Sequence, residues 1–283
     1  TLKDGNPEKQ AFKATIGASE VGVSASGHIG ERTTYIASVR QSYLQLLFKL
    51  LGLPMLPNYI DGQVKFKTRI DRNNELVFIG LAGFDNMKLS DDPDDAGDEY
   101  LLSYLPLLKQ ETFTVGASYK HFTERNVQTY TLSYSYLNNR SNKYLDNDDS
   151  SEENMILRSS ALEGKAQLRF ENRSYHGAWT VREGADVHYR HYDSDLYRMT
   201  ARGIPLDYMT ETGIFGWGLF ASADYKSPTG KVNASAGIRA DGSSFSGKTA
   251  MFWRQLSPRA SVSYMPWKSW SFNASAGIYH QLP

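Results

Sequence analysis

Residues 127–137 read VQTYTLSYSYL, and a large side chain returns at every second position of this stretch. The large side chains share one face of an extended chain: Tyr130, Leu132, Tyr134 and Tyr136. The hydroxyl side chains share the other face: Thr129, Thr131, Ser133 and Ser135. Because successive side chains of a β-strand point to opposite faces, this period of two predicts a strand between an apolar and a polar environment.

The same alternation recurs along most of the chain. It returns at residues 64–70, 112–119, 162–170, 215–226, 232–239 and 271–278. The pattern predicts about thirteen strands of about ten residues, the length that a tilted strand needs to cross a bilayer. Residues 76–81 are irregular because they are apolar on both faces. Glu183 falls on the apolar face of its strand, which predicts a β-bulge or a shifted register there.

The segments between the predicted strands alternate in length. Short turns are predicted at residues 28–32, 71–74, 123–126, 172–176, 227–230 and 266–269, and long loops at residues 42–58, 86–110, 139–159, 193–212 and 241–255. Outer-membrane barrels alternate tight periplasmic turns with long external loops in this way. We therefore predict an all-β, transmembrane, antiparallel up-and-down β-barrel, and a soluble β-sandwich is the alternative fold.

Aromatic residues gather near the predicted strand ends: Tyr119, Tyr136, Tyr225, Tyr264, Trp267 and Trp270. Interfacial girdles of a membrane barrel would place them there, and ordinary β-propensity, which also favours Tyr and Trp, is the alternative explanation. The most apolar stretch, residues 44–56, is shorter than a membrane-spanning helix and contains Lys49 and Pro54. We interpret it as a short helix within a loop.

Composition bounds the class of protein only loosely. Lys and Arg number 31, as do Asp and Glu, so the formal net charge is zero and gives no support to a nucleic-acid partner. Cysteine is absent, which fits an exported protein without disulfides, although many cytoplasmic proteins also lack cysteine. Residues 1–10 are polar and contain no signal-peptide core.

The sequence offers little support for metal or catalytic chemistry. The acidic residues 90–99 could hold Ca²⁺, but they lack EF-hand spacing, and a solvated external loop is the favoured interpretation. The same holds for a second acidic set: Asp146, Asp148, Asp149, Glu152 and Glu153. His188 and His191 are three residues apart on a strand, so they point to opposite faces and cannot share one ion. No G-x-S-x-G, Walker A or dinucleotide-binding motif is present. We predict no catalytic residue, metal or cofactor, and no enzyme.

Two stretches resemble the TonB-dependent receptor family of the outer membrane. Residues 27–54, GHIGERTTYIASVRQSYLQLLFKLLGLP, are similar to an early barrel hairpin of the branch that often carries a carboxypeptidase-like regulatory domain. Residues 257–283, SPRASVSYMPWKSWSFNASAGIYHQLP, resemble a mid-barrel pair of strands, and LKDGNPEKQ at residues 2–10 resembles the passage from plug to barrel. The family implies a plug domain and a barrel of about 22 strands. We therefore expect residues 1–283 to be a partial barrel that lacks the plug and the C-terminal strands, with residues 1–10 as the passage.

This resemblance implies a bacterial outer-membrane receptor that imports a scarce nutrient by energy-coupled transport. The implied partners are TonB through the missing plug, membrane lipid and lipopolysaccharide, a possible surface lipoprotein, and a small-molecule, glycan or peptide ligand. A passive porin or an adhesin barrel is the alternative, and an outer-membrane hydrolase is less favoured. The expected ligand contacts are three loop aromatics: Tyr100, Tyr104 and Tyr144.

Overall fold

A computed structural model describes residues 3–90, 96–267 and 269–280. Within these residues, thirteen strands form one antiparallel sheet in which each strand pairs with its neighbours in the sequence. The strands are β1 (Ala11–Ile16), β2 (Glu20–Ile29), β3 (Thr33–Ser42), β4 (Met55–Arg69), β5 (Asn74–Leu89), β6 (Leu107–Phe122), β7 (Asn126–Tyr144), β8 (Met155–His176), β9 (Trp179–Met199), β10 (Pro205–Lys226), β11 (Val232–Ser243), β12 (Arg259–Trp267) and β13 (Trp270–Gly277). The predicted up-and-down fold is confirmed.

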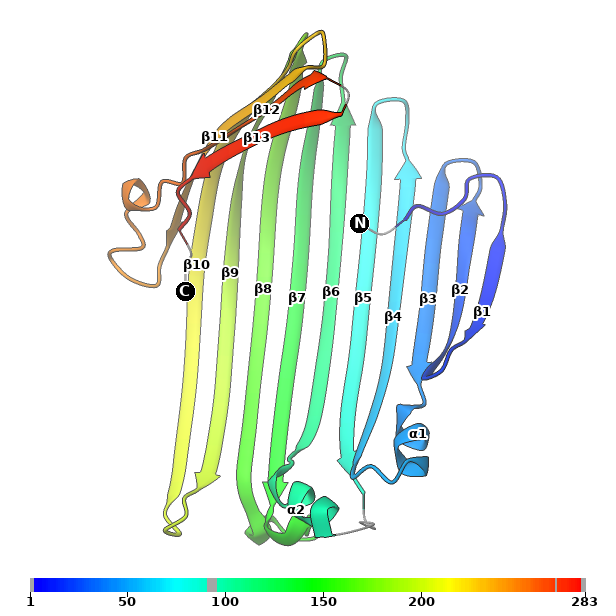
Figure 1. Cartoon of the computed structure of the whole chain (residues 1–283), viewed down its shortest axis with the longest axis vertical. Coiled ribbons are helices and arrows are strands. Elements are labelled where there is room, and N and C mark those ends of the chain that lie inside the picture. The colour runs from blue at the N-terminus through cyan, green and yellow to red at the C-terminus, as the bar shows by residue number, and fades with distance from the viewer. Residues whose placement is uncertain (1–2, 91–95, 268, 281–283) are drawn as a thin grey trace.

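Helices lie in the long connections between the strands. They are α1 (Leu44–Leu50), α2 (Ala96–Tyr104) and the short 3₁₀ turns η1 (Leu145–Asn147), η2 (Glu152–Asn154) and η3 (Phe252–Arg254). No described helix is both long and apolar enough to span a membrane. The connections at the end that carries the β8–β9 turn are short, whereas the other end carries the long connections together with two short ones, at residues 17–19 and 200–204 (Figure 1). The apolar stretch that begins at Leu44 forms a helix, α1, which ends at Leu50.

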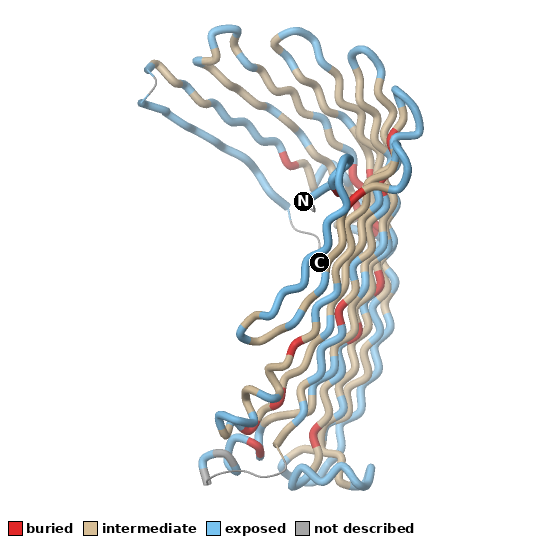
Figure 2. Tube along the Cα trace, turned by 90° about the vertical axis from the view of Figure 1, so that its right-hand side faces the viewer, coloured by how far each residue is buried: buried red, intermediate tan, exposed pale blue. Residues whose placement is uncertain are grey.

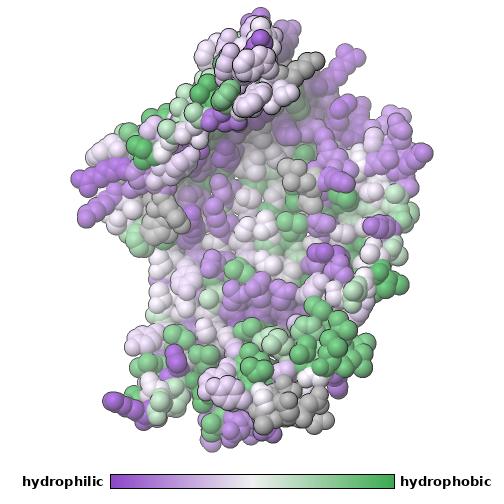
Figure 3. All heavy atoms as spheres, in the orientation of Figure 1, coloured by the Kyte–Doolittle hydropathy of each residue, from purple (hydrophilic) through white to green (hydrophobic). Residues whose placement is uncertain are grey.

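The sheet is curved, and β12 and β13 lie over its concave face (Figure 1). The curvature is visible in profile in Figure 2, where both chain ends lie on the concave side. In the space-filling view of this side, hydrophilic side chains gather over the sheet, and hydrophobic ones gather near α1 (Figure 3). The concave face therefore is the polar one.

The strand register carries one apolar row across the convex face. Directly paired residues, which point to the same face, run Phe12, Ala25, Ala37, Val64, Gly80, Val115, Tyr134, Ala166, Tyr189 and Phe215. The next row on the other face is mostly polar and runs Ser24, Ser38, Gln63, Leu81, Thr114, Ser135, Lys165 and Arg190. Alternation therefore stays in phase from strand to strand, and along this row one face of the sheet is apolar.

Aromatic residues bound this apolar face at two heights. Near the turns, the rings of Trp179 and Tyr225 lie 4.9 Å apart, and those of Tyr130 and Phe170 also lie 4.9 Å apart. Towards the loops, Phe113 stacks on Tyr136 at 4.9 Å. On β9 the apolar face runs from residue 179 to residue 189, roughly 33 Å of extended chain, which a tilted strand needs to cross the hydrocarbon core. This arrangement matches two interfacial girdles.

Three local predictions are wrong. The predicted loop at residues 193–212 is mostly strand, because β9 and β10 stay paired as far as Met199 and Pro205. The predicted turn at residues 172–176 instead lies at Gly177, where φ is +60°, and β8 continues to His176. Glu183 occupies an unbroken register between Asn172 and Ala221, without a bulge, and Asn172 donates to its Oε1 at 3.1 Å.

Candidate functional site

A pocket of about 1150 Å³ opens at the loop end of the sheet. Its walls come from α1, β5, α2, the tip of β7 and η1. The charged side chains among its lining are Lys49, Lys88, Glu99, Lys143, Asp146 and Asp149. Amides add neutral donors and acceptors: Gln45, Asn86, Asn142 and Asn147. The pocket, here called the rim pocket, therefore offers both signs of charge and several hydrogen-bonding groups to a polar ligand.

Lys143 ties α2 to β7 beside this pocket. Its Nζ donates to the carbonyl of Leu105 at 3.0 Å, to the carbonyl of Leu102 and to Oδ1 of Asn147. Carbonyls at a helix C-terminus lack intrahelical partners, so an ammonium placed there completes the end of α2. Lys143 is 7% exposed, and this burial lowers the pKa of its ammonium. One buried side chain thus positions the whole α2 segment.

The three predicted ligand contacts take two positions. Tyr100 and Tyr104 lie on α2 with ring centroids 4.9 Å apart, and they are 64% and 69% exposed. Tyr144 lies at the end of β7 and lines the rim pocket. The structure brings Tyr100 and Tyr104 together as one aromatic surface and places Tyr144 on the pocket wall. Their role in ligand binding stays a prediction.

The residues considered for metal binding do not gather. Of the acidic stretch at residues 90–99, residues 91–95 lie outside the described residues. Over the part of the chain that the structure describes, no three His, Cys, Asp or Glu side chains are placed to hold an ion. His188 pairs with Gly216 and His191 with Gly213, so the two imidazoles lie on opposite faces, which confirms that prediction.

The polar face carries a charged network that the sequence analysis missed. Asp186 on β9 is 3% exposed, and Nη2 of Arg239 on β11 lies 3.0 Å from its Oδ1. Nε of Arg239 also donates to both carboxylate oxygens of Asp241 at 2.9 Å. The guanidinium of Arg169 on β8 lies 3.8 Å from Asp186 and 4.4 Å from the ring centroid of Phe220. Three strands therefore contribute to one ionic cluster around the buried carboxylate of Asp186.

Glycines on β10 make room for this network. A Cβ at Gly218 would collide with the guanidinium of Arg239 and lie 2.8 Å from Oδ1 of Asp241. A Cβ at Gly216 would lie 2.6 Å from Cε1 of His188. Because β10 separates β9 from β11, the bare backbone at Gly218 is the gap through which Arg239 reaches Asp186.

The N-terminal segment is tied to the polar face. Oδ1 of Asp4 accepts from Lys65 at 2.6 Å, and Oδ2 accepts from Lys67 at 2.9 Å. These two hydrogen bonds hold the pKa of Asp4 below its usual value. At the other end of the segment, Gln10 donates to the carbonyl of His28 at 2.6 Å and accepts from the hydroxyl of Tyr35 at 2.8 Å. Tyr35 pairs with Phe66 on the apolar face, so this second attachment lies on that face. Residues 3–10, here called the N-terminal strap, therefore lie against the wall rather than free of it.

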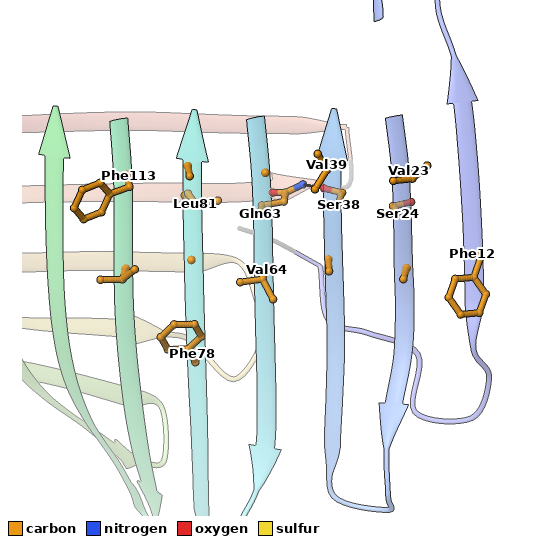
Figure 4. Close-up of a pocket in the computed structure, with 16 residues that line it drawn as sticks. Phe12, Val23, Ser24, Ser38, Val39, Gln63, Val64, Phe78, Leu81 and Phe113 are labelled. Carbon is orange, nitrogen blue, oxygen red and sulfur yellow. Dashed lines mark hydrogen bonds between the residues drawn. The ribbon is translucent and has the colours of Figure 1, made fainter. Parts of the chain in front are cut away.

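A second pocket, of about 680 Å³, lies on the apolar face and is here called the outer groove. Its floor is made of small residues: Ala25, Ala37, Gly62, Gly80 and Ala82. Figure 4 shows Phe12 of β1 at one end and Phe113 of β6 at the other, with β2 to β5 between them. The groove is therefore an apolar depression on the surface that faces lipid in a membrane barrel.

One serine–histidine contact is present at the loop end. Oγ of Ser257 lies 3.3 Å from Nδ1 of His280. Among the described residues, no carboxylate forms an ion pair with His280, so the third member of a hydrolytic triad is not seen there. The pair by itself gives no positive evidence of catalysis.

Comparisons with known proteins agree on the fold. Residues 56–283 match the family model described as TonB dependent receptor-like, beta-barrel. A search of curated proteins finds no significant match.

Several solved structures resemble the chain. One is the ferripyoverdine receptor of the outer membrane of Pseudomonas aeruginosa, with a TM-score of 0.70 and 11% identity over 97% of this chain and 42% of that one. Another is the copper transporter OprC, with a TM-score of 0.66 and 11% identity over 99% of this chain and 47% of that one. A third is the RagAB peptide importer, with a TM-score of 0.58 and 12% identity over 93% of this chain and 36% of that one. The chain thus spans less than half of each of these structures.

Proposed function

Because this chain belongs to the family of TonB-dependent receptor-like β-barrels, we propose that it forms wall, luminal lining and external loops of a receptor that imports a scarce nutrient by energy-coupled transport. Barrels of this family lie in the outer membrane of Gram-negative bacteria, and the family consists of transport receptors rather than enzymes. The single observation that carries the proposal is the unbroken apolar row on one face of a sheet whose opposite face is charged. Lipid requires an apolar outer face on a spanning wall. In a soluble protein a second layer would cover such a face, whereas the strands of the described residues all belong to one sheet.

The free edges of the sheet support a larger barrel. Every residue of β1 and of β13 is exposed, and each strand pairs on one side only. Unpaired backbone groups are costly in hydrocarbon, so we infer that further strands close the barrel between these edges. In this arrangement residues 1–283 are a partial barrel domain that a plug and C-terminal strands complete. The N-terminal strap, held on the polar face by Asp4, would be the passage from the plug.

The loop end is the proposed ligand side. The rim pocket combines charges and amides, and the adjacent rings of Tyr100 and Tyr104 add exposed aromatic surface beside it. A small-molecule, glycan or peptide ligand fits this chemistry, and TonB would supply energy through the plug. A surface lipoprotein partner would contact the same exposed α2 segment, and the apolar face would contact membrane lipid and lipopolysaccharide. A passive porin or adhesin barrel is the alternative, and it shares the wall but needs no energy.

Energy coupling is tested in cells that depend on the full receptor for growth on its nutrient. Uptake should stop when the gene for TonB is deleted and return when that gene is supplied again. Uptake that persists without TonB would contradict the import proposal and favour the passive barrel.

The ligand contacts are tested separately by titrating the nutrient against purified receptor. Replacing Tyr100 and Tyr104 together by Ala should weaken binding by about tenfold, because each exposed ring contributes stacking of about 0.5–1.5 kcal/mol. Tyr208, which is exposed on β10, provides a control as Tyr208→Ala and should leave affinity unchanged. Equal affinity of the wild type, the double variant and Tyr208→Ala would show that Tyr100 and Tyr104 do not contribute to ligand binding.

A further inference from the structure

The outer groove ends at Phe113, and charged residues follow it directly on the same face of β6. Glu111 and Lys109 lie two and four positions beyond Phe113, so their side chains share its side of the strand. Phe113 stacks on Tyr136 of β7, with ring planes 20° apart. This aromatic pair lies where the apolar face ends towards the loops, at the height where lipid headgroups begin.

Three cations cluster at this boundary. Lys109 is directly paired with Arg140, and Lys88 lies on the same face of β5, two positions beyond Asn86, which pairs with Lys109. Like charges in directly opposite positions repel, so the pairing of Lys109 with Arg140 needs an anion. Glu111 serves both, at 3.0 Å from Lys109 and 4.0 Å from Arg140. One carboxylate shared by Lys109 and Arg140 leaves a positive excess there, while Lys88 lies further towards the loops, in the lining of the rim pocket with Glu99, Asp146 and Asp149.

The cation excess is confined to the strands next to the outer groove. At the same level on β9 and β10 the outward residues are acidic, because Asp193 pairs with Glu211. Arg158 on β8 is already matched by Asp195 at 3.1 Å. Lys109 and Arg140 keep side chains that are 55% and 47% exposed, so both can reach a further anion.

We propose that a lipopolysaccharide molecule binds here, with an acyl chain in the outer groove and a lipid A phosphate between Lys109 and Arg140. The groove supplies an apolar bed, and the two cations supply charge-assisted hydrogen bonds at headgroup height. The inference rests on the membrane placement of the proposed function and adds the lipid site to it.

The test is native mass spectrometry on the full receptor, purified in detergent and titrated with defined lipids. Bisphosphorylated lipid A should bind about tenfold more tightly than its dephosphorylated form, and the double variant Lys109→Gln/Arg140→Gln should lose this preference. Arg158→Gln removes an outward cation of the neighbouring strand, which pairs with Asn142 two positions beyond Arg140, and this variant should retain the preference. Equal affinity of the double variant and the wild type for lipid A would overturn the proposal.

The groove is tested by Ala37→Phe, which fills its floor from the lipid side without touching a charge. This variant should bind both forms of lipid A more weakly than the wild type does. Ala166→Phe, outside the groove on β8, should bind both as tightly as the wild type. Phosphatidylglycerol or inorganic phosphate that competes as well as lipid A would also overturn the proposal, because general attraction of anions would then explain the binding.

The membrane placement itself is tested by measuring whether the same purified receptor inserts into liposomes. Failure of the wild type to insert would count against the proposed function itself. Insertion without selective retention of lipid A would count against the lipid site alone.

Discussion

Arg239 and Asp186 form an ion pair, with 3.0 Å between Nη2 and Oδ1, although their strands β11 and β9 are separated by β10. The guanidinium crosses β10 at Gly218, where a side chain would stand in its way. The carboxylate of Asp186 is 2% exposed, so its contacts with the arginines replace contacts with solvent. The side chain of Arg239 thus links β11 to β9 across β10 on the polar face.

Gly218→Val should destabilise the barrel by about 1–3 kcal/mol, because the new side chain displaces Arg239 and leaves a buried carboxylate with a weaker partner. The measurement is urea unfolding of the purified receptor in detergent micelles, followed by tryptophan fluorescence. Gly247→Ala is the control, since nothing lies within 4 Å of a Cβ there. Equal unfolding midpoints for wild type and Gly218→Val would show that the crossing contributes nothing.

Attachment of the N-terminal strap should depend on pH through Asp4. Hydrogen bonds from Lys65 and Lys67 lower the pKa of Asp4 in the folded state, so the attachment is complete above pH 3.8, its ordinary pKa, and is lost as pH falls through the lowered value. A fluorescent probe on a cysteine introduced at Asn6 should report release of the strap at low pH. In Asp4→Asn the probe should report a released strap already at pH 7, and a strap that stays attached in this variant would contradict the assignment.

Glu183 should lower the stability of the barrel because it lies on the lipid-facing surface. Its register keeps it on the apolar face between Asn172 and Ala221. Replacing it with Leu should stabilise the barrel by about 1–2 kcal/mol, because Glu183 lies near the middle of the apolar face of β9, where a charged residue costs more than at the interface. Glu163→Leu makes the same chemical change on the polar face of β8 and should give no stabilisation. Unfolding in urea compares them, and a less stable Glu183→Leu would point to a polar environment at this position.

Lys143→Met should release α2 from β7. The thioether keeps the length of the side chain but cannot donate to the carbonyls of Leu102 and Leu105. Hydrogen exchange in residues 96–104 should accelerate by about tenfold or more, while exchange in the paired core of β7 stays unchanged. Lys88→Met, from the same pocket, is the matched control. Unaltered exchange in α2 would show that other contacts hold the helix.

The sequence predicts the sheet well because a spanning wall imposes a simple rule on it. Every second residue must tolerate lipid, so a period of two persists through β7, β8 and β10, and it yields the strand order directly. This rule applies only to the part of each strand that lies within the bilayer. Residues 193–199 and 205–212 mix polar and apolar side chains on both faces, and they read as a loop although backbone pairing continues through them. Pairing outside the bilayer needs no apolar face, so hydropathy carries no signal there.

The charged network was missed for a different reason. Arg169, Asp186 and Arg239 each fit the polar phase of a strand, and nothing local distinguishes them from residues that face solvent. Their meeting depends on the register of four strands and on the absence of a side chain at Gly218. Glu183 shows the converse case. A bulge would be the local solution for a misplaced charge, but the hydrogen bond from Asn172 lets it stay in register.

The central claim is that β7 spans a membrane with alternate residues in lipid. The chain has no cysteine, so single cysteines at successive positions from 129 to 137 can carry a spin label in the full receptor reconstituted in liposomes. Relaxation by oxygen should be strong at positions 130, 132, 134 and 136, and relaxation by a water-soluble nickel complex should be strong at the positions between them. An accessibility profile without this period of two, or with the two sets exchanged, would contradict the account.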